Sequence, residues 1–178
     1  MGSDKARLNV RGRPLIDHVA SSLAALSSSI LVVGGAVDLL ELLSPTTTPT
    51  RWVEDAFPGE GPLGGVITAL REFQDHPFAA VVSCDLVGLD PKLIELLRRE
   101  VDRENTALAI PVDDEGVPQW HVSVWRTNAL DMIVAEFTAG TRSFRQAVAS
   151  IGVCQVRTDT VVLDLDTPTD VETYESRK

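Results

Sequence analysis

The sequence has few cysteines and no long apolar run, and each absence excludes a class of protein. Its two cysteines, Cys84 and Cys154, lie far apart and form no C-x-x-C motif. Zinc and redox sites are therefore disfavoured, and we expect both to be small buried side chains in a reducing compartment. No stretch approaches the roughly 20 apolar residues of a membrane span, and no signal-peptide pattern opens the chain. We expect a cytoplasmic protein without a membrane segment.

Positive charge is also scarce. The 178 residues include 16 Lys and Arg against 26 Asp and Glu, for a net charge of −10. This balance argues against binding to nucleic acid or to anionic membranes, because both depend on clustered basic residues. The segment between Met1 and His18 is locally basic, and solvated surface charge is the favoured interpretation of that cluster. An anionic substrate remains compatible with the composition if local positive charge or a metal ion faces it.

The apolar pattern predicts one α/β domain, and 44% hydrophobic content is enough for a core. Predicted strands alternate with predicted helices, which indicates a three-layer, Rossmann-like fold with a mostly parallel sheet. The run 119–125 alternates apolar and polar residues, as one antiparallel or edge strand would. The other expected strands are 30–33, 51–53, 78–83, 106–112, 153–157 and 161–163. The expected helices are 15–26, 37–43, 66–73, 91–105, 128–137, 143–151 and a last one capped by Thr167 or Thr169.

The segment Phe78–Pro91 organises the rest of the chain. It begins with a short, continuous apolar run that is typical of a strand buried on both faces, and this run stops just before Asp85. A carboxylate just past the carboxyl end of a central parallel strand lies where open α/β sheets bind ligands. Such a carboxylate needs a cation or several hydrogen-bond donors. A bound Mg²⁺ would satisfy it, but from this segment alone an N-cap or turn aspartate is the favoured interpretation of Asp85.

A glycine-rich loop, 58–65, precedes the predicted helix 66–73 and indicates close approach of the backbone to another group. Its letters match G-x-G-x-x-G, the dinucleotide fingerprint. We reject that match because the fingerprint belongs to the first strand–helix turn and requires an acidic residue about 20 residues later. Here that distance falls in the apolar run near Ala79. Pro62 also lacks an amide that could hold a pyrophosphate.

Four segments together resemble one enzyme family, the molybdenum cofactor guanylyltransferases (MobA-like proteins). These segments, in family order, are M-G-S-D-K-A at 1–6, P-G-E-G-P-L-G-G at 58–65, C-D at 84–85 and D-L-D-T-P-T-D at 164–170. The family signatures are R-M-G-x-D-K-A, D-x-x-P-G-x-G-P-L-x-G, C-D-x-P and a terminal [ND]-x-[DN]-T-P-x-D. The resemblance covers nearly the whole chain. It implies transfer of GMP from GTP to the phosphate of molybdopterin, with Mg²⁺ and release of pyrophosphate.

The resemblance also assigns roles to individual residues. It implies that Lys5 contacts the nucleotide phosphates, that Asp85 binds the metal, and that Lys5 and Asp85 are therefore the catalytic pair. It places Asp166 as a second metal ligand, and two hard oxygen ligands with substrate phosphates and water suit Mg²⁺. The residues implied to line the nucleotide pocket are Lys5, Asp55, Gly61, Pro62, Leu63 and Asp85.

The sequence departs from the family pattern at two places. Family members carry a strand and an L-A-G-G-x-S-x-R loop before the R-M-G-x-D-K segment. The chain starts at the methionine of that segment, so we expect Met1 to be an internal methionine of a longer native protein. The second departure is at the acceptor side, where Gln119 keeps a polar contact but Trp120 and His121 are bulkier than the family residues. Gln119 and His121 are the expected acceptor-binding residues. His121 could act as a general base, but the favoured interpretation is a strand histidine that forms a hydrogen bond to a neighbouring residue.

Three functions follow from these observations. The first is the guanylyltransferase, a single domain that acts as a monomer or weak homo-oligomer. The second is a cytidylyltransferase that uses CTP and a related phosphorylated acceptor, because the Asp164-x-Asp166 ending also resembles those enzymes. The third is a non-catalytic binding homologue that keeps the sheet and the acceptor pocket. The sequence does not decide between GTP and CTP, because base choice rests on the L-A-G-G-x-S-x-R loop.

Overall fold

The computed structural model describes residues 5–160, 163–165 and 168–176. Its strands are β1 (Asn9–Val10), β2 (Arg13–Pro14), β3 (Ile30–Val33), β4 (Thr50–Val53), β5 (Phe78–Val82), β6 (Leu86–Val87), β7 (Leu108–Val112), β8 (Val122–Arg126), β9 (Val153–Arg157) and β10 (Leu163–Asp164). Its α-helices are α1 (Leu15–Ala24), α2 (Pro62–Glu72), α3 (Pro91–Arg103), α4 (Leu130–Thr138), α5 (Phe144–Ile151) and α6 (Pro168–Ser176). Three 3-10 helices are η1 (Lys5–Arg7), η2 (Val37–Leu42) and η3 (Thr127–Ala129). The described part of the chain contains no helix with the length and apolar character that a membrane crossing requires.

The central sheet has the strand order β5-β8-β7-β9. β8 runs antiparallel to both of its neighbours, whereas β7 and β9 are parallel to each other. Ala79 of β5 lies opposite Trp125 of β8, which sets the register of that pair. The predicted antiparallel strand at 119–125 is thus confirmed in type, although it begins three residues later, because the chain is still turning at Gln119, whose carbonyl accepts a hydrogen bond from the Val122 amide.

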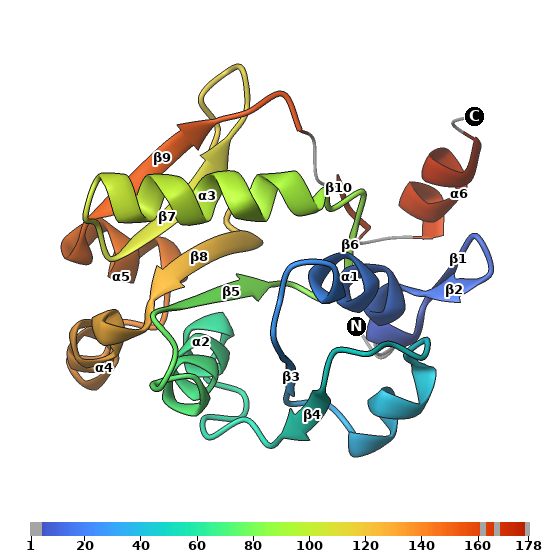
Figure 1. Cartoon of the computed structure of the whole chain (residues 1–178), viewed down its shortest axis with the longest axis horizontal. Coiled ribbons are helices and arrows are strands. Elements are labelled where there is room, and N and C mark those ends of the chain that lie inside the picture. The colour runs from blue at the N-terminus through green and yellow to red at the C-terminus, as the bar shows by residue number, and fades with distance from the viewer. Residues whose placement is uncertain (1–4, 161–162, 166–167, 177–178) are drawn as a thin grey trace.

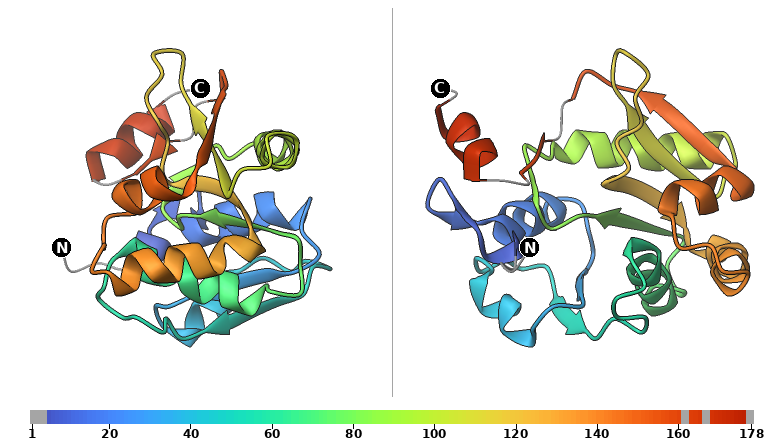
Figure 2. Two further views of the ribbon diagram at one scale, coloured as in Figure 1. Left: turned by 90° about the vertical axis from the view of Figure 1, so that its left-hand side faces the viewer. Right: turned by 180° about the vertical axis from the view of Figure 1, so that it is seen from behind.

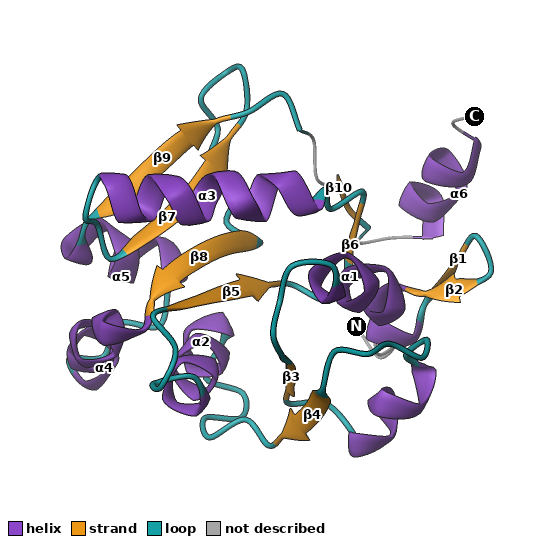
Figure 3. Cartoon of the chain, in the orientation of Figure 1, coloured by secondary structure: helices purple, strands orange, loops and turns teal. Residues whose placement is uncertain are grey.

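Helices cover both faces of this sheet, so the molecule has the predicted three layers (Figures 1 and 3). Strand residues alternate between the faces, and apolar clusters form on each side. One cluster packs α2, α4 and α5 against side chains such as Leu108, Ile110 and Trp125. The other packs α1 and α3 against the alternate residues, such as Ala109, Val122 and Val124. The three-layer α/β prediction is therefore confirmed.

β3 and β4 form a separate parallel pair that is not hydrogen-bonded to β5. α2 packs against both β3 and β5, which keeps the pair in the same layer as the central sheet. The two views of Figure 2 show these strands on the far side of β5 from β8. Two further pairs, β1 with β2 and β6 with β10, are short antiparallel ribbons. The sequence pattern did not predict β1, β2 or β6.

α2 begins at Pro62 rather than at the predicted Val66. Proline is well suited to a first helical position because its fixed φ fits the helix and its missing N–H has no partner there. Gly64 and Gly65 therefore lie inside the helix, although glycine weakens a helix interior. Gly64 has a packing reason, since a Cβ there would lie 2.8 Å from the Cβ of Phe57.

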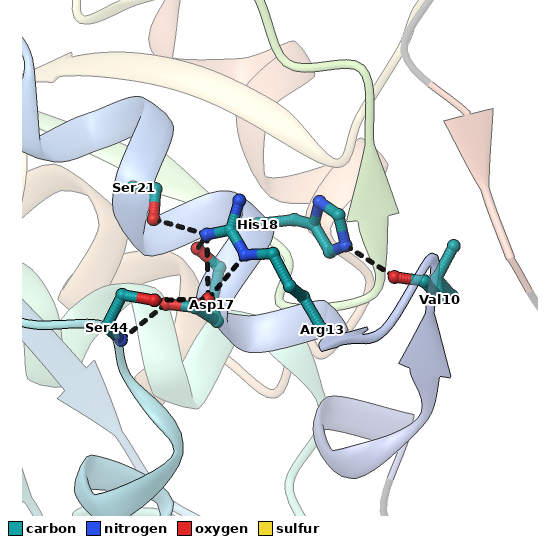
Figure 4. A network of polar contacts seen from close by, with 6 residues as sticks. All are labelled: Val10, Arg13, Asp17, His18, Ser21 and Ser44. Carbon is teal, nitrogen blue, oxygen red and sulfur yellow. Dashed lines mark hydrogen bonds and ion pairs between the residues drawn. The ribbon is translucent and has the colours of Figure 1, made fainter.

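A buried carboxylate connects the amino-terminal part of the chain to the loop after η2 (Figure 4). Asp17 on α1 is 2% exposed and accepts hydrogen bonds from the amide of Ser44 at 2.6 Å and from its hydroxyl at 2.9 Å. Arg13 donates its Nε–H to the same carboxylate at 2.7 Å. On the next residue of α1, the Nε2 of His18 is 2.9 Å from the carbonyl oxygen of Val10. These bonds hold β1, β2, α1 and the 44–49 loop together.

Candidate functional site

The carboxyl end of β5 brings together the two residues that the sequence placed at the centre of the site. The Nζ of Lys5 lies 3.3 Å from Oδ2 of Asp85, although the residues are 80 positions apart in the chain. The Asp85 side chain is 14% exposed and that of Lys5 is 32% exposed. Ser83, the last residue before the turn, donates its hydroxyl to the other oxygen of Asp85. The site thus contains a half-buried, charged and hydrogen-bonded pair.

The environment of Asp85 keeps its carboxyl group ionised. Burial alone would raise the pKa of Asp85, but the hydrogen bonds from Ser83 and Lys5 and the positive charge of Lys5 outweigh burial, so the pKa is lowered. A charged carboxylate oxygen at the edge of a sheet is a hard ligand of the kind that Mg²⁺ prefers. The geometry is therefore compatible with cation binding between this residue and a substrate phosphate.

The alternative interpretation of Asp85 is an N-cap or turn aspartate; the N-cap is wrong, whereas the position in a turn is confirmed. The cap of α3 is Asp90, whose side chain accepts a hydrogen bond from the amide of Lys92 at 2.9 Å. Asp85 instead lies in the turn between β5 and β6. Its carboxylate contributes nothing to the start of α3, so the residue is available for another role.

The predicted second metal ligand, Asp166, lies outside the described residues. Its chain neighbour Leu165 donates its amide to the carbonyl oxygen of Asp85 at 3.2 Å. The backbone that leads to Asp166 thus passes directly beside Asp85. Among the described residues, no three His, Cys, Asp or Glu side chains come together as a metal site. Such a sparse protein ligand set is normal for Mg²⁺, which is usually held by one or two carboxylates plus substrate phosphates.

The Gly61–Leu63 segment lies at the start of α2 and borders the site only in part. Gly61 has a φ of 85°, a left-handed conformation that favours glycine. Pro62 lines the same cavity as Lys5 and Asp85. Leu63 is fully buried in the core, so any contact of this residue with a ligand is limited to its main chain.

Asp55 has a structural role in the loop before α2. Its Oδ1 accepts hydrogen bonds from the amide of Phe57 at 3.0 Å and from the hydroxyl of Thr68 at 3.1 Å. It is not among the residues that line the cavity with Lys5 and Asp85. Contact of Asp55 with a nucleotide therefore remains a prediction.

The two predicted acceptor-binding residues lie on the segment that leads into β8. The carbonyl oxygen of His121 accepts a hydrogen bond from the Ser83 amide at 2.9 Å, and His121 lines the cavity. The main-chain amide of Gln119 donates a hydrogen bond to the carbonyl oxygen of Pro111 at 2.9 Å. The side-chain oxygen of Gln119 is buried and has no hydrogen-bond partner among the described residues. A buried acceptor without a hydrogen-bond donor lowers the stability of the folded state unless a ligand supplies the donor.

Three residues near the site were not assigned a role from sequence. Ser83 follows β5, and the local signal that could have indicated its role is the Ser-x-Asp spacing, since a serine hydroxyl can bond to a nearby group in a turn. Trp120 and Phe144 line the cavity, and their rings meet edge to face with centroids 6.0 Å apart. Phe144 starts α5, far away in sequence, and no local pattern connects it to the site.

The basic residues near the amino terminus are distributed among different partners. Arg7 pairs with Asp38, and Arg13 pairs with Asp17. Arg11 lies over the ring of Tyr174 at 4.5 Å. Within the described residues from 5 to 13, Lys5 is the basic side chain that lines the cavity. The interpretation of solvated surface charge is therefore adequate for Arg7 and Arg11, whereas Arg13 belongs to the buried Asp17 network.

The expectation that both cysteines are buried is wrong for Cys84, which is exposed in the turn after β5. The apolar run that predicted burial ends one residue earlier, where the chain leaves the sheet. Cys154 is half-buried on β9, and burial raises the pKa of its thiol, with a further contribution from the nearby carboxylates of Glu100 and Glu104. Both cysteines are free thiols.

A cavity of about 1090 Å³ connects these features. Lys5, Asp85 and His121 form its polar end, and Pro62 and Trp120 lie at its border. Much of the remaining lining is apolar and extends between β3 and β5, although Ser27, Ser28, Ser29, His76, Glu95, Arg98 and Ser123 also line the cavity. The polar end lies at the carboxyl end of β5, at the point where the strand order of an open α/β sheet reverses, which is where such sheets bind ligands.

Comparison with known proteins identifies the family. The family model of the MobA-like NTP transferase domain matches residues 1–155. The chain belongs to this family. Among its relatives, the probable molybdenum cofactor guanylyltransferase of Natronomonas pharaonis is 30% identical over 190 residues, covering 98% of this chain and 89% of the relative. That of Chloroflexus aggregans is 31% identical over 153 residues, covering 84% of this chain and 71% of the relative.

Solved structures support the fold of this MobA-like chain. The molybdopterin-guanine dinucleotide biosynthesis protein A of Archaeoglobus fulgidus superposes with a TM-score of 0.77 at 19% identity, covering 98% of this chain and 90% of that one. The 2-C-methyl-D-erythritol 4-phosphate cytidylyltransferase of Thermus thermophilus superposes with a TM-score of 0.75 at 17% identity, covering 98% and 93%. At these identities the likeness concerns the fold alone. The predicted family and the nucleotidyltransferase class are confirmed.

Proposed function

We propose that this MobA-like protein transfers GMP from GTP to the phosphate of a molybdopterin-type acceptor and releases pyrophosphate. The observation that carries the proposal is the Lys5–Asp85 pair at the carboxyl end of β5, which lines a cavity of about 1090 Å³. The name of the Natronomonas relative, 30% identical over almost the whole chain, supports guanylyl transfer over cytidylyl transfer.

The chemistry requires positioning more than covalent participation of the protein. An oxygen of the acceptor phosphate forms a bond to the α-phosphorus of GTP, and the bond from that phosphorus to the bridging oxygen of the β-phosphate breaks. Pyrophosphate leaves with the electron pair. Catalysis of such a displacement comes from in-line positioning and from positive charge near the phosphate oxygens. We assign Lys5 to the phosphates, because its ammonium group lies at the polar end of the cavity.

We propose Mg²⁺ as the cofactor, held by Asp85 and by Asp166. The donor set fits this ion, since Asp85 is ionised, half-buried and within the same cavity as Lys5. When bound there, the ion would neutralise charge on the triphosphate. The start of α2 would face the nucleotide with main-chain amides, as helix amino termini do for anions. Gln119 and His121 would face the acceptor.

Product analysis tests the proposal. The protein is incubated with labelled GTP or CTP, Mg²⁺ and molybdopterin, with EDTA in place of Mg²⁺ and omission of the acceptor as controls. In the complete reaction we expect pyrophosphate release and a labelled dinucleotide with GTP but not with CTP. Preference for CTP would establish the cytidylyltransferase instead. Binding of molybdopterin without turnover of either nucleotide would leave the non-catalytic binding function.

Replacement of Lys5 by alanine is expected to weaken GTP affinity by about 10–100-fold, because one charge-assisted hydrogen bond is worth roughly 1.5–3 kcal/mol. The acceptor KM should change by less than about threefold, because Lys5 is assigned to the nucleotide phosphates and not to the acceptor. Isothermal titration with GTP and steady-state kinetics with the acceptor measure the two effects. Lys92→Ala, at an exposed position on α3, is the matched control. A larger effect on the acceptor than on GTP would contradict the assignment of Lys5.

Gln119→Leu is expected to raise the acceptor KM by about tenfold while GTP affinity stays unchanged, because a ligand donor would lose its buried partner. The unfolding free energy should stay constant or increase, since the variant removes a buried acceptor that has no partner in the described structure. Steady-state kinetics measures the acceptor KM, and thermal unfolding measures the stability. Gln155→Leu on the exposed side of β9 serves as the control. Loss of stability without a change in acceptor KM would show that Gln119 acts only in folding.

A further inference from the structure

The hairpin formed by β1 and β2 has an unusual residue in its turn. The strands pair Val10 with Arg13, which leaves Arg11 and Gly12 as the two turn residues. Both have positive φ values, 50° for Arg11 and 79° for Gly12. Two-residue hairpin turns with this backbone favour Asn-Gly, because asparagine adopts the left-handed conformation more easily than a long side chain does. Arginine therefore costs free energy in this turn, and such a cost indicates a role outside the turn.

Arg11 contacts the last helix, α6, which lies beside the hairpin in Figure 1. Its main-chain amide donates a hydrogen bond to Oε1 of Glu175 at 2.8 Å, and its guanidinium donates one to the carbonyl oxygen of Tyr174 at 3.2 Å. The central carbon of the guanidinium also lies 4.5 Å from the centre of the Tyr174 ring, which is a cation–π geometry. Arg11 thus joins the hairpin to α6 across 163 positions of the chain.

The part of the chain that leads into α6 passes beside the candidate site. Its strand β10 pairs with β6, the strand that directly follows the Asp85 turn. The amide of Leu165 then donates a hydrogen bond to the carbonyl oxygen of Asp85 at 3.2 Å, and Leu165 is 2% exposed. The next residue in the sequence is Asp166, the predicted second metal ligand. We call residues 163–165 and 168–176 the C-terminal segment; it contacts the site at one end and the hairpin at the other.

Apolar packing holds α6 only in part. A small cluster around the buried side chains of Val10 and Leu165 lies between the hairpin and the C-terminal segment. Among the described residues of α6, Val171 and Tyr174 pack against this cluster, and both are only half-buried. Two half-buried side chains of a nine-residue helix bury little apolar area. The polar and cation–π contacts of Arg11 therefore contribute a large share of what keeps α6 in place.

We propose that Arg11 is a positioning residue for the metal site. By fixing α6 to the hairpin, it holds the C-terminal segment against the Asp85 turn and thereby sets the position from which Asp166 reaches the ion. The inference rests on the proposed function, because it takes a divalent cation at Asp85 as its starting point. Arg11 is not among the residues that line the cavity, so it acts through the C-terminal segment and not by contact with a substrate.

Replacement of Arg11 by asparagine separates this role from that of a turn residue. Asparagine suits the turn better than arginine does, so a residue that served only the turn would leave metal affinity unchanged and Tm equal or higher. Loss of the guanidinium contacts to Tyr174 should instead speed exchange of the Leu165 amide by about tenfold and weaken Mn²⁺ binding by about five- to tenfold. NMR measures the amide exchange without metal. The probe for affinity is Mn²⁺ alone, which takes the same oxygen ligands as Mg²⁺ and is followed by electron paramagnetic resonance of the free ion.

Three further variants serve as controls. Arg11→Lys keeps a positive charge over the Tyr174 ring and should recover much of the Mn²⁺ affinity that Arg11→Asn loses. Arg99→Asn removes the same charge from an exposed position on α3 and should change neither the exchange nor the affinity. In a Tyr174→Leu background, Arg11→Asn should have a smaller effect than in the wild type, because the two side chains act on each other.

Two results would overturn the proposal. Unchanged exchange of the Leu165 amide in Arg11→Asn would show that other contacts hold the C-terminal segment. Faster exchange with unchanged Mn²⁺ affinity would show that Arg11 supports the fold and not the metal site. The proposed cofactor fails on a different result, namely that the wild type itself binds no Mn²⁺, so failure of the inference is distinguishable from failure of the proposed function.

Discussion

Replacement of Asp85 by asparagine is expected to reduce kcat for nucleotidyl transfer by about 10³-fold or more while the protein stays folded. The variant keeps the size and one hydrogen-bond acceptor of the side chain but removes its negative charge. Loss of metal-assisted charge stabilisation is worth several kcal/mol, and about 4 kcal/mol corresponds to a thousandfold in rate. Asp85→Ala should have the same kinetic effect. Pyrophosphate release measures kcat, and circular dichroism measures the fold.

The matched control is Asp114→Asn, which removes the same charge from an exposed turn. Its activity and Tm should equal those of the wild type. If Asp85→Asn unfolded the protein, the carboxylate would be structural and its pairing with Lys5 would serve the fold. If the variant were folded and active, Asp85 would have no part in the reaction.

Asp17→Ala is expected to lower the free energy of unfolding by about 3 kcal/mol, because it leaves the donors of Ser44 and Arg13 without their buried acceptor. This is a large part of the roughly 5–15 kcal/mol that stabilises a domain. Urea denaturation measures the change. Asp38→Ala removes an exposed partner of Arg7 and should cost at most about 1 kcal/mol. Equal effects of the two variants would contradict the structural role of Asp17.

The Asp17 network also predicts how stability depends on pH. Burial would raise the pKa of Asp17, but the Ser44 and Arg13 hydrogen bonds outweigh it and lower the pKa below the ordinary value of 3.8. A lowered native pKa means that the unfolded state binds more protons, so this contribution to stability is fully present above about pH 4. It is lost as pH falls through the native pKa. Urea midpoints between about pH 2 and 6 should show this loss in the wild type and less of it in Asp17→Ala.

Several elements could be predicted from the sequence because local patterns specify them. The apolar runs at 30–33 and 78–82 are strands within one residue of the prediction, and β8 is antiparallel as its alternation indicates. The start of α2 was missed because Gly64 and Gly65 weaken a helix locally, whereas packing of Gly64 against Phe57 requires the glycine there. The buried Asp17 was also missed, since an acidic residue on an amphipathic helix is usually solvated.

The sequence by itself determined the alternation of strands and helices, the break after β5 at which Asp85 lies, and the motifs that identify the family. These depend on residues that are close together in the chain. Only the tertiary structure decided that Lys5 and Asp85 meet across 80 positions, that Asp17 binds Ser44, and that β3 and β5 border one cavity. The physical reason is that these contacts form between segments whose packing brings them together, and no local pattern records which segments will be neighbours.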